Sequence, residues 1–364
     1  MKGSENARNI TQNPLVLSSY KGKSITSKNL KNGTVKVVAG GTNFAFYHNE
    51  SNRPANIITI SASGANAGFV NYWKDPIFAS DCTTILASKE LTTKYIFYFL
   101  KTNQKIVFNL QKGQAQPHVY ADDLKTLKLP LPPLEIQKCI VEECQKIDEE
   151  YKGAQNTIET CKQKIESIMQ NVQGRQKNLG DICNINSETI VPTKNPYQKF
   201  IYIDIDSVVN GEGYFNTNKV ITGKDAPSRA RRKATSESTI ISTVRPNLKG
   251  FAYVDKEIPN SVFSTGFAIL NSKNTNILMN KFVYYNFMYS NELMEQMIKA
   301  MPKGQYPSIN KTNIESFFIH VPTIAEQKQI ISQIEKLEAE IDSSKIIISA
   351  IPKRKKSVLD KYLL

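Results

Sequence analysis

The clearest alternation of apolar and polar positions begins after Pro133. Apolar or small residues recur there, and after the opening step they lie alternately four and three positions apart, the spacing of a heptad seam. They are Ile136, Ile140, Cys144, Ile147, Tyr151, Ala154, Ile158, Cys161, Ile165, Ile168 and Val172. A helix over residues 134–172 would be about 58 Å long at about 1.5 Å per residue. Because one small domain cannot bury so long a stripe, the pattern predicts a partner helix.

A second apolar series near the C-terminus supplies that partner. Its members are Ile330, Ile334, Leu337, Ile341, Ile348, Ile351, Val358 and Tyr362. Ser344 and Lys355 interrupt the series, and Pro352 is expected to kink the helix because its ring clashes with the preceding turn. Thr323 is expected to cap the helix, with Glu326 as its capping-box partner.

The two helix starts are near copies, "LPPLEIQKCI" from Leu131 and "VPTIAEQKQI" from Val321. Gln137 aligns with Gln327, and upstream "GFVNYWKDPIFASDCTTIL" is echoed by "GFAYVDKEIPNSVFSTGFAIL" in the same order. This order indicates a duplicated module, a globular head followed by a long helix. We therefore expect an α/β (α+β) fold with two similar heads and two antiparallel coiled-coil helices, related by a pseudo-twofold axis. The expected segments are 1–132, 133–175, 176–322 and 323–364.

Composition narrows the function classes. The net charge is +14, yet the two helical segments are close to neutral, so the heads carry the basic excess that a phosphate backbone would require. No apolar run approaches the roughly 18 residues needed to span a bilayer, and the polar N-terminus lacks the apolar stretch of a secretory signal. The five cysteines form no CxxC pair, which favours a reducing cytoplasm over a disulfide framework or a zinc site.

These features resemble the specificity subunit of type I restriction–modification systems. The resemblance rests on the two proline- and glutamine-bearing helix starts, on "ITISASGANAGFVNYW" and "IISTVRPNLKGFAYV" in the heads, and on "LGDICNI" at Leu179–Ile185. It implies two target recognition domains that each read half of a split double-stranded DNA sequence. It also implies helices that dock methyltransferase subunits, with a restriction or translocase subunit as a further partner and no membrane. The first head departs from the pattern: it lacks a clear counterpart of "LGDICNI" and begins near Tyr20–Val38, which leaves a truncated head open.

Catalytic motifs are incomplete. "KNPY" at Lys194–Tyr197 has one proline too few for an adenine methyltransferase and is interpreted as a turn before a strand. "GEGYFN" at Gly211–Asn216 is interpreted as a hairpin turn, and "YKGKS" at Tyr20–Ser24 lacks the first glycine of a P-loop. Glu150-x-Lys152 resembles a nuclease motif but falls in the heptad seam as a solvated pair. The chain is therefore predicted to be non-catalytic, with no cofactor of its own, and S-adenosylmethionine and ATP are expected on partner subunits.

Candidate DNA contacts are polar and basic residues in Gly- or Pro-containing loops, where recognition residues usually lie. The second head offers Arg229, Arg231, Arg232 and Lys233 before a predicted strand, and Arg245, Asn247 and Lys249 in "TVRPNLKG". The first head offers Ser63, Asn66, Tyr72 and Lys74 at the corresponding place. Two Lys-Gly-Gln loops add Lys112, Gln114 and Gln116, and Lys303, Gln305, Tyr306, Ser308 and Lys311. Each set has a plainer alternative as a solvated loop or ordinary turn.

Two further groups stay open. Asp204 and Asp206, placed in a predicted strand, can accept from cytosine or cap a strand end. "PKRKK" at Pro352–Lys356 can meet DNA, an acidic partner or only solvent. The alternatives to a specificity subunit are a coiled-coil scaffold with basic RNA- or protein-binding heads, and an uncharacterised nuclease or methyltransferase.

Overall fold

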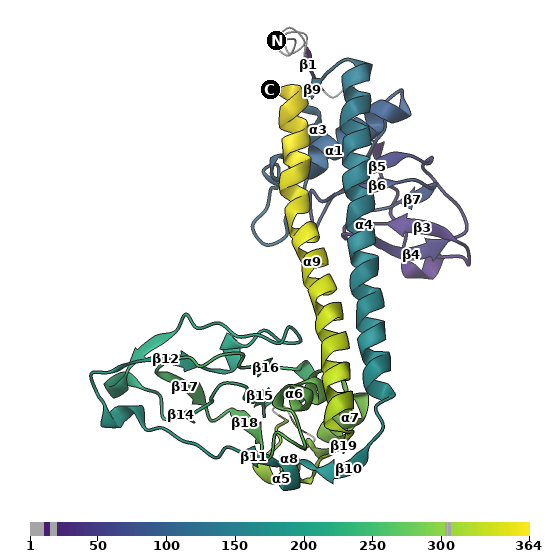
Figure 1. Cartoon of the computed structure of the whole chain (residues 1–364). Coiled ribbons are helices and arrows are strands. Elements are labelled where there is room, and N and C mark those ends of the chain that lie inside the picture. Colours follow the sequence, from purple (N-terminus) through teal and green to yellow (C-terminus); the bar gives the residue numbers. More distant parts are fainter. Residues whose placement is uncertain (1–10, 15–19, 303, 305–306) are drawn as a thin grey trace, which may run out of the picture. The chain divides into compact units, whose positions relative to one another are not determined.

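The computed structural model describes residues 11–14, 20–302, 304 and 307–364. The chain divides into two compact units, Met1–Gln155 with Ser344–Leu364, and Asn156–Ser343. Two long helices, α4 (Leu134–Gln170) and α9 (Ile324–Leu363), contribute to both units (Figure 1). We call the part of each unit outside α4 and α9 its head. Among the described residues, none of the helices is long and apolar enough to cross a membrane.

The first head is built from a small strand pair, two sheets and three short helices. The pair is β1-β9, and the sheets have the strand orders β2-β8-β5-β6 and β4-β3-β7. Helix α1 packs against β5 and β6. The elements are β1 Thr11–Pro14, β2 Tyr20–Lys21, β3 Val35–Val38, β4 Phe44–His48, β5 Ile57–Ser61, β6 Val70–Trp73, β7 Ile77–Ala79, β8 Cys82–Ile85, α1 Glu90–Thr102, α2 Gln104–Phe108, α3 Ala121–Lys125 and β9 Lys128–Leu131.

The second head repeats this plan with one extra strand. Its pair is β10-β19, and its sheets have the orders β11-β18-β15-β16 and β13-β12-β17-β14. Helix α6 packs against β15, β16 and β18. The elements are β10 Arg175–Asn178, α5 Leu179–Ile182, β11 Cys183–Ile185, β12 Lys199–Ile203, β13 Val220–Thr222, β14 Ala230–Arg232, β15 Thr239–Ser242, β16 Phe251–Tyr253, β17 Ser261–Ser264, β18 Phe267–Ser272, α6 Asn280–Tyr289, α7 Asn291–Ala300, α8 Lys311–Ser316 and β19 Phe318–Val321.

The matching pairings confirm the predicted mixed fold with an internal repeat. β3 pairs parallel with β7, as β12 does with β17, and β1 pairs with β9 as β10 does with β19. The expectation that the first head begins near Tyr20 is wrong, because β1 lies earlier in the chain. That the head lacks a counterpart of "LGDICNI", which forms α5 and β11 in the second head, stays a prediction. The segment between β1 and β2, residues 15–19, is outside the described part. The division into segments 1–132, 133–175, 176–322 and 323–364 stays a prediction.

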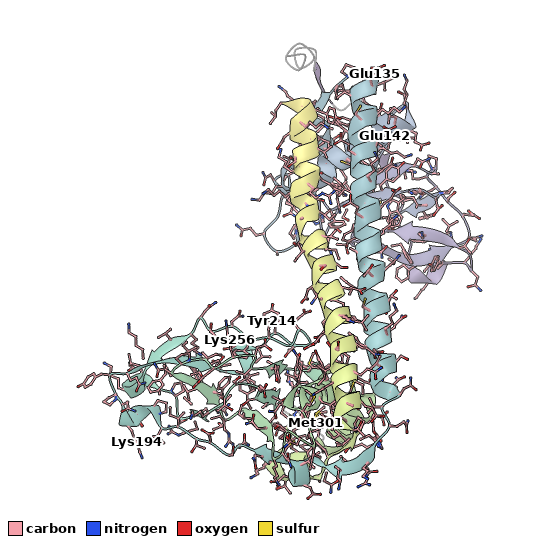
Figure 2. The ribbon with its side chains drawn as sticks, in the orientation of Figure 1. Glu135, Glu142, Lys194, Tyr214, Lys256 and Met301 are labelled. Atoms are coloured by element: carbon pink, nitrogen blue, oxygen red, sulfur yellow. The ribbon has the colours of Figure 1, made fainter. Side chains whose placement is uncertain are left out.

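In the first unit, the first half of α4 packs against the last part of α9. Ile140, Cys144 and Ile147 share one buried cluster with α9 residues and with the head strands and helices; the α9 members are Ile351, Val358 and Leu359. The pairing is antiparallel, since Glu143 meets Lys361 while Glu150, later in α4, meets the earlier Arg354. Exposed Glu135 and Glu142 lie on this half of α4 (Figure 2).

The second unit repeats the arrangement with the other helix halves. Cys161, Ile165 and Met169 of α4 join a cluster with head residues and with Ile331, Ile334 and Ile341 of α9. The Cys161 thiol lies 3.4 Å from a Glu340 carboxylate oxygen. In each unit, therefore, the largest buried cluster joins the coiled coil to the head, and the heptad prediction is confirmed within each unit.

The details of the seam correct several expectations. Met169 takes the last buried position of α4, and Val172 lies beyond its end at Gln170. Ser344 is buried, so a small side chain fills the seam there. Helix α9 continues through Pro352 to Leu363, and the kink expected at Pro352 stays a prediction.

The repeated glutamine anchors each helix start. Gln137 Nε2 donates to the Pro132 carbonyl at 2.8 Å, and Gln327 Nε2 donates to the Pro322 carbonyl at 2.9 Å. Gln327 is further satisfied, because its Nε2 reaches the Ile277 carbonyl and its Oε1 accepts from the Met279 N–H, both at 2.8 Å. The buried Gln137 Oε1 has no hydrogen-bond partner among the described residues.

The capping box predicted at the start of α9 is confirmed. The Thr323 N–H donates to Glu326 at 2.9 Å, while the Glu326 N–H donates to the Thr323 hydroxyl at 3.4 Å. This reciprocal pair satisfies donors that a helix N-terminus otherwise leaves unpaired.

In each head, a tyrosine also forms a hydrogen bond to a carboxylate of the long helix that follows the head. The Tyr98 hydroxyl donates to Asp148 at 2.7 Å, and Tyr285 donates to Glu338 at 2.8 Å. In the second unit, Tyr289 donates to the other oxygen of Glu338 at 2.7 Å. In the first unit, Lys355 of α9 forms an ion pair with Asp148, so the lysine that interrupts the apolar series has a structural partner.

The Tyr98→Phe substitution tests this anchor. It removes a hydrogen bond to a charged acceptor in a buried setting, so we expect a loss of stability of about 1–2 kcal/mol. The urea midpoint of unfolding measures it. Tyr47→Phe, at a half-exposed tyrosine of the same head, is the matched control and should leave the midpoint unchanged. Equal midpoints for the two variants would contradict the anchor.

Acid should weaken the helix pairing of the first unit. Hydrogen bonds from Lys361 and Tyr362 hold the pKa of Glu143 below its ordinary value of 4.5. A carboxyl whose folded pKa is depressed adds stability above its unfolded pKa, and this is lost as pH falls through the folded value. The thermal midpoint should therefore drop below about pH 4.5. In the Lys361→Met variant, which lacks the lysine that bonds to Glu143, the thermal midpoint should drop less on acidification than in the unchanged chain. The Lys138→Met variant removes only an exposed pair within α4, so its midpoint should drop as much as that of the unchanged chain.

Candidate nucleic-acid interface

Two equivalent loops carry the polar residues expected to meet DNA. The first links β5 to β6 over residues 62–69, and the second links β15 to β16 over residues 243–250. Ile60 pairs with Val70, and Ile241 pairs with Phe251, so the two loops have the same length and register. "ASGANAGF" therefore aligns without a gap on "TVRPNLKG".

Each loop is held against the Lys-Gly-Gln loop of its own head by the same backbone hydrogen bonds. The Gly64 N–H donates to the Pro117 carbonyl at 3.0 Å, and the Arg245 N–H donates to the Pro307 carbonyl at 2.9 Å. The Val119 N–H donates to Ala62, and the Ile309 N–H to Thr243, both at 2.9 Å. Each head thus brings together two of the loops singled out from the sequence.

Both loops need left-handed backbone at the same two positions. In the first loop these are Gly64 and Gly68, with φ of +82° and +88°. In the second they are Arg245 and Lys249, with φ of 46° and 54°. A residue with a Cβ pays roughly 1–2 kcal/mol for this conformation, whereas glycine adopts it freely. The second loop therefore keeps two long basic side chains at positions where glycine would be less strained.

Lys249 has a structural role in the second head. Its amine donates to the Met288 carbonyl at 2.8 Å, near the end of α6, and burial lowers its pKa. The 3₁₀ helix Pro246–Leu248 packs against α7. Helices α6 and α7 therefore hold the loop in place, while Arg245 and Asn247 are exposed at its tip.

Asn66 occupies the tip of the first loop at the position equivalent to Asn247, and it is likewise exposed. Ser63 donates to the Asp81 carboxylate, so its hydroxyl is engaged within the head. Tyr72 is part of the core: its ring packs on Phe97 and its hydroxyl donates to Asn56 at 2.9 Å. Burial raises the pKa of Tyr72 to about 12, while Lys74 is exposed after β6.

The Lys-Gly-Gln loops are described in part. Gln114 and Gln116 are exposed, and Lys112 pairs with Asp123 at 2.7 Å. In the second head, Ser308 is exposed and Lys311 lies 3.5 Å from Glu315. Lys303, Gln305 and Tyr306 lie outside the described residues.

The basic run before β15 divides into different environments. Arg229 is exposed, while Arg231 and Arg232 are half-buried in β14. Arg232 Nε is buried without a hydrogen-bond partner among the described residues, and burial lowers the pKa of its guanidinium. Lys233 pairs with Glu188 at 2.8 Å. Of this run, Arg229 has the most accessible charge.

A hairpin that the first head lacks adds a third element to the second site. β3 and β4 are joined by a short turn, whereas the longer connection from β12 to β13 forms a hairpin in which Val208 bridges Phe215. The Gly211 N–H of this hairpin donates to the Lys249 carbonyl at 2.9 Å, which places the hairpin beside the loop of residues 243–250. Half-exposed Tyr214 lies on this hairpin (Figure 2). The turn predicted at Gly211–Asn216 is confirmed.

The described part of the chain has a cavity of about 410 Å³ on the coiled coil and one of about 260 Å³ beside the hairpin. The smaller one is lined by Asp204, Asp206, Ser207, Asn216, Asn218 and Lys219. The strand predicted through Asp204 and Asp206 is wrong, because β12 ends at Ile203 and Asp204 caps the 3₁₀ helix Ile205–Ser207. Burial would raise the pKa of Asp204, but hydrogen bonds from Lys219 and Ser207 lower it overall. The sequence analysis did not identify Asn216, Asn218 and Lys219. The signal that could have found them is the connection from β12 to β13, which is longer than the equivalent connection from β3 to β4.

The motifs that resemble catalytic sites have structural explanations. Gly22 of "YKGKS" packs against backbone, since a Cβ there would lie 1.8 Å from the Ser80 carbonyl oxygen. Glu150 forms a two-bond pair with Arg354, not a pair with Lys152. Lys356 pairs with Asp360 at 2.7 Å, so most of the "PKRKK" charges are matched within the chain. The five cysteines are free thiols, and no metal-binding group of His, Cys, Asp or Glu occurs among the residues described.

Comparison with known proteins places both halves of the chain in one family. The sequence profile described as Type I restriction modification DNA specificity domain matches residues 16–165 and 171–353. The chain is 26% identical over 170 residues to the Type I restriction enzyme HindI specificity subunit of Haemophilus influenzae, covering 46% of this chain and 36% of that protein. It is 31% identical over 125 residues to the MjaVIII specificity subunit of Methanocaldococcus jannaschii, covering 34% of this chain and 28% of that protein. The matched regions thus span about a third of these relatives' length.

One solved structure has a similar fold over nearly the whole chain. It is the S subunit of a type I restriction–modification system from M. genitalium, with a TM-score of 0.64 and 17% sequence identity. The match covers 95% of this chain and 93% of that chain. At this identity the likeness concerns the fold.

The strain at Arg245 generates a prediction about stability. Arg245→Gly relieves a left-handed backbone position, so we expect the unfolding free energy to stay level or rise by up to about 1 kcal/mol. Thermal unfolding of the full chain measures it. Arg229→Gly, at an exposed arginine next to β14, is the control and should not raise stability. A clear loss of stability in Arg245→Gly would mean that the arginine is there to hold the loop.

Proposed function

The chain belongs to the family of type I restriction modification DNA specificity domains, and from this premise we propose that it is the sequence-specificity subunit of a type I restriction–modification complex. It recognises a bipartite double-stranded DNA target, with one half read by each head. The observation that carries the proposal is the pair of loops with identical register and hydrogen bonding but different side chains. Such a pair can hold two DNA half-sites in the same way while reading different bases.

Charge supports the DNA assignment. The chain carries a net charge of +14, and several of the basic residues on α9 are matched by acids within the chain. The heads therefore retain the surplus that attracts a phosphate backbone. Arg229 and Lys74 are exposed basic residues of the heads.

In this proposal α4 and α9 dock methyltransferase subunits and set the spacing between the half-sites. One turn of DNA is about 34 Å, a span that helices of this length can match. The heads correspond to segments 1–132 and 176–322, and the helical spacers to 133–175 and 323–364. A restriction or translocase subunit joins the complex where the system has one.

The chain itself is assigned no catalytic step. S-adenosylmethionine and ATP are bound by the partner subunits, and the complex works in the cytoplasm. The incomplete catalytic motifs support this assignment, because the residues that resemble them serve packing and ion pairs.

Selection from a random DNA pool tests the proposal. The chain co-expressed with its methyltransferase subunits should enrich a split motif, two short specified sequences separated by an unspecified spacer of fixed length. Binding by the chain alone should be weak and should fall steeply as salt rises, because it rests on phosphate contacts. A continuous motif, or no motif from the assembled complex, would contradict the proposal.

A further inference from the structure

The tips of the two equivalent loops differ in a way that bears on which bases are read. The first tip is Gly64-Ala65-Asn66-Ala67-Gly68, in which asparagine is the single side chain longer than a methyl group. The second keeps the asparagine, Asn247, and surrounds it with larger residues. Resting on the function proposed above, we infer that Asn66 and Asn247 read equivalent adenines in the two half-sites, and that Arg245 adds a guanine contact in the second half-site alone.

The position of the asparagines supports base contact. Both are exposed, both lie between the two left-handed residues of their loop, and neither side-chain amide makes a hydrogen bond to another described residue. The glycines and alanines beside Asn66 allow the backbone to approach a groove closely. An asparagine amide matches the N6 donor and N7 acceptor of adenine in the major groove.

The contrast between Gly64 and Arg245 supports the guanine contact. A Cβ built on Gly64 meets nothing within 4 Å, so the frame leaves room for a side chain that the first head does not use. The second head places arginine there in spite of the left-handed backbone. A guanidinium can donate two hydrogen bonds to guanine O6 and N7. Lys249, at the other left-handed position, is instead bonded to the Met288 carbonyl and is not assigned to a base.

The experiment is selection from a random DNA pool by the assembled complex of the full chain with its methyltransferase subunits. Asn66→Ala should reduce the preference at one base pair of one half-site by about tenfold or more, and Asn247→Ala should do so in the other half-site. Arg245→Gly should remove a guanine preference from the half-site affected by Asn247→Ala. Gly64→Arg should introduce one into the half-site affected by Asn66→Ala.

Asn49→Ala is the matched control. Asn49 is exposed in the first head just after β4, whereas the turn before β4 is bonded to the end of β5, next to the loop, through the Ser61 hydroxyl and the Gly41 carbonyl. This control should leave both half-sites unchanged. The inference is overturned if Asn66→Ala and Asn247→Ala leave the motif intact, or if they weaken binding to all sequences equally, which would indicate phosphate contact. If the unsubstituted complex returns no split motif, the proposed function itself fails, which separates the two outcomes.

Discussion

The antiparallel packing of α4 against α9 is the interaction on which the rest of this structure depends. Neither helix could bury its apolar stripe alone, and the largest buried cluster of each unit joins head residues to both long helices. In each unit, one half of α4, one half of α9 and the head meet in a single cluster. The tyrosine–carboxylate bonds at Asp148 and Glu338 and the glutamines at the helix starts then orient each head on its helix. A change that separates the helices would therefore expose the head residues that share these two clusters with them.

In the first unit, charged residues of α4 and α9 form ion pairs with each other. Glu143, Asp148 and Glu150 of α4 face Lys361, Lys355 and Arg354 of α9. Exposed pairs of this kind add little stability individually, but opposite charges on facing helices disfavour other registers and orientations. The basic "PKRKK" segment is thereby matched largely within the chain. The net positive charge that remains belongs mainly to the heads, where the proposed binding of DNA requires it.

The two heads share a backbone arrangement but carry different side chains in their equivalent loops. Loops of equal length, joined by equivalent backbone hydrogen bonds, hold glycine in one head and arginine or lysine in the other at left-handed positions. The second head also adds β14 and the hairpin beside its loop. Under the proposed function, the bases that are read can change by substitution within a loop while the packing of the strands and helices stays the same.

The sequence by itself determined the helices, the repeat, the mixed fold and the loops that carry polar residues, because heptad spacing, proline and glycine are local signals. It also predicted the Thr323–Glu326 cap, which depends on neighbours within one turn. Only the tertiary structure decided which cations are already paired, that Tyr72 packs against the core while Lys249 bonds to the Met288 carbonyl, and that β1 pairs with β9 in the first head. These outcomes depend on contacts between residues far apart in the chain, and no local pattern encodes the partner that a side chain meets when the strands and helices close around it.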